Sequence, residues 1–309
     1  MFGASAPRTN NAELRTRGWE LELGWQDRIN KDWSYSITGT LSDYKTVITK
    51  YASPDNKYSG WYAGRDYGEI WGYRVVGIAK SDAEMDAYVA KHDMSNMGDG
   101  VAIRGRLGGG DIMYADLNND GSVNNGAQTI DDPGDMTKIG NNTPRFAYGL
   151  TLTAQWRWID FRAFFQGIGK RDFLFSGSAP FYGIASEWQR TFYKDHLDYF
   201  RYAGSELGAN PDAYYARPRV DGFNTKDSDY FLQDASYFRL KNIQIGFSLP
   251  ENTKLAKYVK KARLYVSGEN LFTHTNLRIF DPEAVTGDWG AGKAYPNYRT
   301  WSVGLEVTF

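Results

Sequence analysis

The C-terminal sequence RTWSVGLEVTF, residues 299–309, alternates strictly between two kinds of side chain. Its large apolar residues are Trp301, Val303, Leu305, Val307 and Phe309, and those between them are polar or glycine. This period of two predicts a β-strand with one apolar face. In a soluble protein that face would pack on a core, whereas in a membrane barrel it would contact lipid.

The same alternation recurs along the chain and predicts about seven strands. They are residues 17–27, 33–42, 145–156, 159–166, 242–250, 262–272 and 299–309. Each is close to the ~9–11 residues that a tilted strand needs to cross a bilayer. Trp or Tyr stands near the ends of the apolar rows, and the content of 22 Tyr, 17 Phe and 10 Trp fits aromatic girdles at two membrane interfaces.

The links between consecutive predicted strands are alternately short and long. The long links cover residues 49–143, 172–235 and 273–298, and they are polar and rich in Gly, Asn, Asp and Tyr. Short turns at one end and long loops at the other are typical of outer-membrane barrels. If Phe309 lies on the periplasmic side, all three long links are extracellular. Residues 67–79 within the first link resemble a strand, which we expect to be an arm of an extracellular hairpin.

Composition excludes several other classes. There is no cysteine, so a disulfide scaffold, a thiolate zinc site and a cysteine nucleophile are ruled out. The net charge of −1 argues against a nucleic-acid binder. No run of ~18 apolar residues is present to form a transmembrane helix. The three histidines, His92, His196 and His274, are far apart, and no nucleophile elbow occurs, so we do not expect an enzyme.

The start of the sequence has no apolar region of the kind found in signal peptides. Seven strands cannot close a wide barrel, and an open sheet edge is not tolerated in lipid. We therefore expect the chain to be incomplete.

Several motifs resemble, in order, those of SusC/RagA-type TonB-linked outer-membrane transporters. They are GGGDIMYADLNNDGSVN with TKIGNNTPRFAYGL, IDFRAFFQGIG, DASYFRLKNIQIGFSLP, ARLYVSGENLFTHT, FDPEA and YPNYRTWSVGLEVTF. The resemblance covers most of residues 17–309 and implies the C-terminal portion of a plugged antiparallel barrel of about 22 strands. The signal sequence, the TonB-contacting segment and the plug have no counterpart in this chain.

The resemblance also implies a location and partners. The protein would lie in the outer membrane and import an oligosaccharide or peptide, with energy from TonB acting through the plug. A SusD-like surface lipoprotein would close over the extracellular mouth. Leu305, Val307 and Phe309 would belong to the signal read by the barrel-assembly machinery. Two alternatives stay open: a soluble β-rich carbohydrate-binding protein, and an inactive remnant of a transporter.

One loop has the spacing of a calcium site. Asp116, Asn118, Asp120, Ser122 and Asn124 stand at alternate positions, with Gly121 at the turn, as in the first half of an EF-hand loop. The twelfth position is Ala127 rather than Glu, and Asp131 or Asp132 would have to substitute. The alternative is a loop whose Asn and Asp side chains cap its own turns. Bound Ca²⁺ would stiffen the loop rather than catalyse.

Aromatic side chains of the long links are candidates for contact with a ligand or partner, because their faces stack on sugars and peptide side chains. We single out Trp61, Tyr62, Trp71, Tyr73 and Trp188. The alternative is that these residues pack the links together. GRLGGGD, residues 105–111, is expected to be a flexible loop rather than a phosphate cradle, since no GK[ST] follows. FDPEA, residues 280–284, is expected to be a rigid turn with a structural role.

Overall fold

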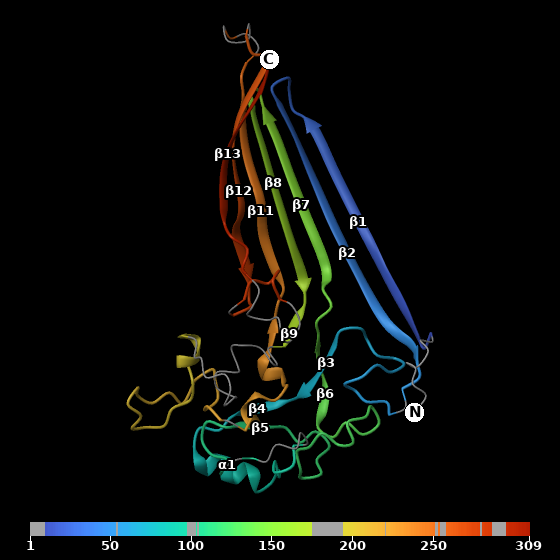
Figure 1. Cartoon of the computed structure of the whole chain (residues 1–309), viewed down its shortest axis with the longest axis vertical. Helices are drawn as coiled ribbons and strands as arrows, with labels where there is room; N and C mark the ends of the chain where they lie inside the picture. The colour runs from blue at the N-terminus through green and yellow to red at the C-terminus, as the bar shows by residue number, and fades with distance from the viewer. Residues whose placement is uncertain are drawn as a thin grey trace, which may run out of the picture.

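The computed structural model describes residues 10–53, 55–97, 103, 105–174, 194–219, 221–250, 253, 258–278, 280–285 and 295–309. A single antiparallel sheet of seven long strands forms a tall, curved wall (Figure 1). Its strands follow chain order: β1 (Ala12–Arg28), β2 (Trp33–Tyr51), β7 (Arg145–Trp156), β8 (Ile159–Lys170), β11 (Tyr237–Ser248), β12 (Lys261–Thr275) and β13 (Thr300–Thr308). The predicted all-β class is confirmed.

The register of the wall aligns apolar side chains across neighbouring strands. One row of paired residues runs through Tyr35, Ala154, Phe161, Ile245, Val266 and Val303. The adjacent row on the other face runs through Ser36, Thr153, Arg162, Gln244, Ser267 and Ser302. Since successive side chains of a strand point to opposite faces, the wall has one apolar and one polar face along its whole width.

The wall is longer at one side than the alternation predicts. β1 and β2 extend beyond the ~9–11 residues that a bilayer requires. In β2 the additional part, residues 43–51, keeps the β-propensity of Val, Ile, Thr and Tyr but carries Asp43 and Lys45 in the apolar row. These two strands therefore extend beyond the part of the wall that has an apolar face.

Three connections leave the same end of the wall and fold together into a unit that we call the cap (Figure 1). They lie between β2 and β7, between β8 and β11, and between β12 and β13. The cap contains the strand pairs β3 (Glu69–Tyr73) with β6 (Met136–Asn141), β4 (Val75–Ile78) with β5 (Ile112–Tyr114), and β9 (Asp172–Leu174) with β10 (Leu232–Asp234). Residues 67–79 thus form two short strands that pair with later parts of the same connection, outside the wall.

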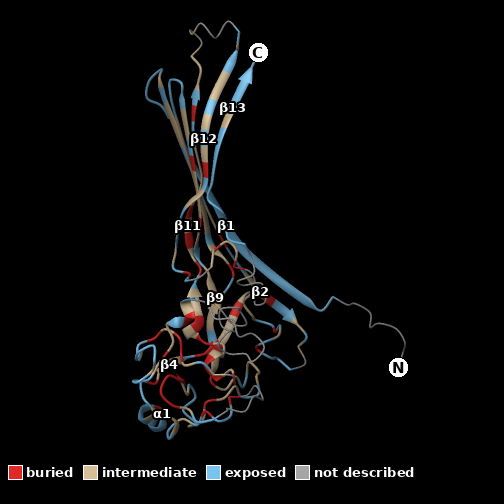
Figure 2. Ribbon diagram, turned by 60° about the vertical axis from the view of Figure 1, so that its left-hand side comes forward, coloured by how far each residue is buried: buried red, intermediate tan, exposed pale blue. Residues whose placement is uncertain are grey.

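A hydrophobic core holds the cap together. Ile112 and Tyr114 from the first connection pack with Phe223 from the second and Leu277 from the third. Figure 2 shows that buried residues are concentrated in the cap, whereas most of the wall is exposed or intermediate. Because one core includes all three connections, they form one folded body rather than separate loops.

The cap also contains short helical elements that the sequence analysis did not predict. Helix α1 (Asp82–Val89) begins at Ser81, whose side chain accepts a hydrogen bond from the backbone N–H of Glu84. The Glu84 carboxylate accepts in turn from the N–H of Lys80, close to a capping box. Three 3₁₀ turns follow later: Lys194–Leu197, Phe223–Thr225 and Asp229–Phe231. Among the described residues, no helix has the length and apolar character to span a membrane.

Candidate functional site

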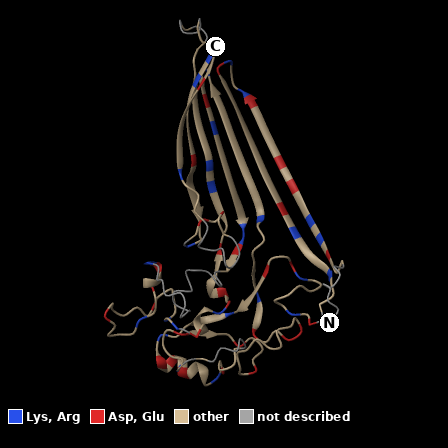
Figure 3. Cartoon of the chain, viewed as in Figure 1, with Lys and Arg blue, Asp and Glu red and all other residues tan. Residues whose placement is uncertain are grey.

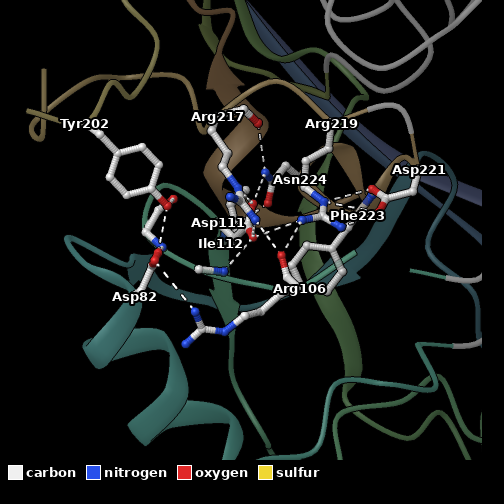
Figure 4. A network of polar contacts seen from close by, with 12 residues as sticks. Asp82, Arg106, Asp111, Ile112, Tyr202, Arg217, Arg219, Asp221, Phe223 and Asn224 are labelled. Carbon is white, nitrogen blue, oxygen red and sulfur yellow. Dashed lines mark hydrogen bonds and ion pairs between the residues drawn. The ribbon is translucent and has the colours of Figure 1, made fainter. Parts of the chain in front are cut away.

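The most extensive polar network of the cap centres on the fully buried carboxylate of Asp111 (Figure 4). Arg217 Nε donates to Asp111 Oδ1 at 2.6 Å, and Arg219 Nη1 donates to Oδ2 at 3.1 Å. The Asn224 amide adds a bond of 2.8 Å to Oδ1, and its own oxygen accepts from Ile112 N–H. The network joins the first connection to the second. With its carboxylate fully satisfied, it is built to hold two segments together rather than to react.

The glycine-rich stretch 105–111 lies beside this network and has a packing role. Gly110 has a φ of +85°, and a Cβ there would collide with the Phe200 ring. Gly109 donates its N–H to Asp82 Oδ1 at 2.8 Å, and the Tyr202 hydroxyl donates to the same oxygen at 2.7 Å. The glycines allow the backbone to approach the second connection closely.

The FDPEA motif attaches the third connection to the wall. Arg239 on β11 is 2% exposed and donates to Asp281 Oδ1 at 2.6 Å and also to Glu283. Lys241 Nζ donates to Glu283 Oε2 at 2.9 Å. Both carboxylates of the motif are thus held by cations of the wall, which gives this turn a structural role.

Two of the singled-out aromatics surround the buried carboxylate of Glu69. The Tyr62 hydroxyl donates to Glu69, and Trp71 Nε1 donates to Oε1 at 2.9 Å. Lys138 Nζ lies 2.7 Å from Oε2. Burial acts to raise the pKa of Glu69, but the hydrogen bonds from Lys138, Tyr62 and Trp71 outweigh it, so this pKa lies below its usual value. The same burial and the Glu69 contact raise the pKa of Tyr62.

The remaining aromatics occupy different positions. Tyr73 is 4% exposed and donates its hydroxyl to the Met97 carbonyl, while its ring borders a cavity of about 400 Å³. Trp61 is exposed and lies near the rings of Tyr51 and Tyr67. Trp188 lies outside the described residues. The placement of Tyr62, Trp71 and Tyr73 favours the alternative in which these side chains pack the connections together.

The predicted calcium loop is a compact turn after β5. Asp116 Oδ2 accepts from Gly121 N–H at 2.9 Å, Asn118 Oδ1 accepts from Asp120 N–H at 3.0 Å, and Asp120 Oδ1 accepts from Ser122 N–H at 2.8 Å. The Asn124 side-chain oxygen instead accepts from Gly126 N–H. Over the described residues, no group of three or more carboxylate or histidine side chains converges as a metal cluster would.

Asp135, which the sequence analysis missed, closes this loop. Its Oδ1 accepts from Leu117 N–H at 2.6 Å, and its Oδ2 accepts from Asn124 N–H at 2.8 Å. Asp135 is fully buried, whereas Asp131 and Asp132 are exposed. Asp132 forms hydrogen bonds within the neighbouring turn, to Ala127 N–H and Thr129. Asp135 thus holds the two ends of the loop together through their backbone N–H groups, a role that the sequence analysis did not assign to any residue.

The polar face of the wall carries a chain of charges near the short turns. Arg263 on β12 donates to both carboxylate oxygens of Asp160 on β8, at 2.9 and 2.6 Å, and to Gln244 on β11. Glu306 on β13 lies 3.4 Å from the same guanidinium group. Figure 3 shows that charged residues occur along several wall strands. A Cβ on Gly246 would meet the ends of the Arg263 and Asp160 side chains, so a larger residue there would displace this pair.

The terminal strand β13 forms one edge of the wall. Its apolar residues Leu305 and Val303 pair with Leu264 and Val266 of β12, and they are 68% and 73% exposed. Phe309 follows the strand and is 79% exposed. Within the described part of the chain, neither β1 nor β13 has a partner strand on its outer edge.

A wall with one apolar face, short turns at one end and a large cap at the other defines a segment of an outer-membrane type β-barrel. Comparison with known proteins agrees with this class. The chain is 25% identical to TonB-dependent receptor P3 of Formosa agariphila over 99% of its length, and 22% identical to TonB-dependent receptor SusC of Bacteroides thetaiotaomicron over 97%. These comparisons confirm the resemblance to SusC/RagA-type TonB-dependent receptors.

The structure comparison gives the same fold. The structure titled RagAB peptide transporter matches 97% of this chain with a TM-score of 0.66 and 22% identity. The chain spans about 30% of the length of receptor P3 and 30% of the matched RagAB chain. No family model matches the sequence.

Proposed function

We propose that this chain forms the C-terminal part of the barrel wall, with its extracellular cap, of a TonB-dependent importer in the outer membrane. The observation that carries the proposal is the matched register, which aligns apolar side chains on one face of all seven strands. An apolar face of this width would be an aggregation surface in water but is required in lipid. This argues against the soluble carbohydrate-binding alternative.

Several finer features belong to the same proposal. The substrate would be an oligosaccharide or a peptide, TonB would supply energy through a plug domain elsewhere in the receptor, and a SusD-like lipoprotein would cover the cap. The support is the similarity to SusC and to the structure titled RagAB peptide transporter. Leu305, Val307 and Phe309 would be read by the barrel-assembly machinery, since they form an exposed terminal apolar row.

The test compares residues 1–309 with a full-length receptor that carries them, both expressed behind a signal sequence. We expect the full-length receptor to fractionate with the outer membrane, to be heat-modifiable on gels and to take up substrate. Residues 1–309 alone should aggregate or be degraded, because each unpaired edge group in hydrocarbon costs several kcal/mol. A water-soluble monodisperse monomer of residues 1–309, or energy-dependent uptake by them alone, would contradict the proposal.

A further inference from the structure

The loop at residues 116–124 contains a buried charge whose hydrogen bonding is incomplete. The Asp116 side chain is 3% exposed, and its Oδ2 accepts from Gly121 N–H and lies 3.4 Å from His92 Nδ1. The N–H groups of Asn119 and Asp120 also face this carboxylate, but its buried Oδ1 has no hydrogen bond of ordinary geometry among the described residues. Buried carboxylate oxygens are nearly always paired, so an unpaired one indicates a missing partner.

The Asp116 carboxylate faces the inside of the loop. The bond from Gly121 N–H crosses the turn, so Asp116 points into the loop rather than away from it. Gly121 has a φ of +85°, which glycine adopts without strain, and the turn it forms lets its N–H reach back to Asp116. The partner that Oδ1 lacks would therefore lie inside the loop.

We propose that this partner is a Ca²⁺ ion. Its ligands would be Asp116 Oδ1, the side-chain oxygens of Asn118 and Asp120, and the backbone carbonyl of Ser122. Hard oxygen ligands at these alternate positions are the set that Ca²⁺ takes in EF-hand-type loops, and water completes the coordination. Asp120 Oδ2 accepts from Asn118 Nδ2 at 2.9 Å, and the Ser122 carbonyl accepts from Asn124 Nδ2 at 3.2 Å. Each oxygen that accepts one N–H bond retains a second lone pair for the ion.

Asp135 acts as a positioning residue for this site. Its two oxygens hold the N–H groups of Leu117 and Asn124, and so fix the two ends of the loop. The loop is also paired with the segment after helix α1: Asp93 N–H donates to the Gly121 carbonyl at 2.8 Å, and Val123 N–H donates to the Asp93 carbonyl at 2.7 Å. Val123 is fully buried. Calcium would thus tie the α1 region of the cap to the 111–135 region.

The site has only two carboxylate ligands, which predicts weak affinity. Sites in extracellular modules bind Ca²⁺ with Kd values of about 10⁻⁴–10⁻³ M, and we expect this range. The inference does not depend on the transport proposal, since it concerns the cap alone.

The experiment is a calcium titration of the full-length receptor that carries these residues, purified in detergent after chelator treatment and followed by calorimetry. Wild type should bind Ca²⁺, and Asp120→Ala should weaken binding at least about tenfold, since it removes one of two charged ligands. Asp212→Ala is the matched control, because it removes the same charge from an exposed position of the cap outside residues 111–135. It should bind as wild type does.

A variant with higher affinity distinguishes the loss of a calcium ligand from misfolding of the loop. Asn118→Asp adds a third carboxylate at the third loop position and should bind Ca²⁺ more tightly, a result that a misfolded loop cannot give. Wild type that binds no Ca²⁺ at about 10 mM, ten times the weakest expected Kd, would overturn the inference. Equal affinities of Asp120→Ala and Asp212→Ala would overturn it as well. So would a structure grown with calcium in which Asp116 Oδ1 has no ion at about 2.3–2.6 Å.

Discussion

The wall and the cap are stabilised in opposite ways. In the wall, apolar side chains such as Val303 and Leu305 are exposed on one face, and few of the described wall residues are buried. In the cap, apolar residues of three connections share a core, and charged groups such as Asp111 and Glu69 are buried with their partners. The apolar face of the wall therefore has to be covered by its surroundings, whereas the cap buries its apolar side chains in its own core.

The comparison also separates what each part can do. The wall repeats one alternating pattern over seven strands that follow chain order. The cap brings together residues more than a hundred positions apart, such as Asp111 and Arg217. Under the proposed function, specific recognition would therefore belong to the cap, and insertion into the membrane to the wall.

The largest expected effect is on the buried network of the cap. Asp111→Ala would leave the buried end of the Arg217 guanidinium without its carboxylate and Arg219 with Asp221 alone, and we expect a loss of about 3–5 kcal/mol in cap stability. Limited proteolysis of the full-length receptor should show faster cleavage in the cap while the wall stays resistant. Asp212→Ala is the control, since its pair with Lys80 is exposed and worth about 0–1 kcal/mol. Equal cleavage of the two variants would show that the network does not hold the cap.

The next effect is on the apolar face of the wall. Leu305→Arg should cost about 2–4 kcal/mol if this position lies near the membrane midplane. Folding of the full-length receptor into liposomes, followed in urea, measures this loss. The effect should be confined to the wall, so cap proteolysis of the folded fraction should match that of wild type.

A pH dependence is expected from Glu69 in the cap. Hydrogen bonds from Lys138, Tyr62 and Trp71 hold the pKa of the folded-state carboxyl below the ordinary value of 4.5, despite the opposing effect of burial. A lowered folded-state pKa means stability that is fully present above about 4.5 and is lost as the pH falls through the folded-state value. Cap proteolysis with an acid-stable protease should increase below that pH. Glu69→Gln should flatten the profile, and an unchanged profile in this variant would assign the acid effect to other groups.

The smallest effect is on the polar face of the wall. Glu306→Gln should change stability by no more than about 1 kcal/mol, because its pair with Arg263 is long and mostly exposed. The same urea measurement compares it with Leu305→Arg at the neighbouring position. If Glu306→Gln were the more damaging of the two, the assignment of the two faces would be wrong.

The wall was predictable from the sequence because alternation is a local signal. Trp301 to Phe309 show a period of two that needs no knowledge of distant residues. Bulges, such as the register shift between Leu240 and Asn242, were not predicted, since they depend on the partner strands. The sequence analysis did not predict helix α1, although Ser81 and Glu84 form a recognisable capping signal, because the helix has only eight residues.

The cap was predictable only in part. The ligand positions of the 116–124 loop follow a local spacing, but the hydrogen bonds of Asp135 to Leu117 and Asn124 depend on how the chain folds back, so spacing alone did not indicate them. The partners of Asp111 lie in another connection, and no sequence pattern marks them. The aromatics looked like ligand contacts because their number is visible in the sequence, whereas their burial, as for Tyr62 and Tyr73, follows from tertiary packing.

The most direct test of the central claim is an accessibility scan of strand β13. Residues 1–309 contain no cysteine, so single cysteines can be placed at each position from 300 to 308 and spin-labelled in the full-length receptor in liposomes. Collisions with oxygen, which concentrates in lipid, should be highest at Trp301, Val303, Leu305 and Val307. Collisions with a water-soluble nickel complex should be highest at the positions between them. The opposite phase, or accessibility to the nickel complex at every position, would contradict the assignment of the apolar face to lipid.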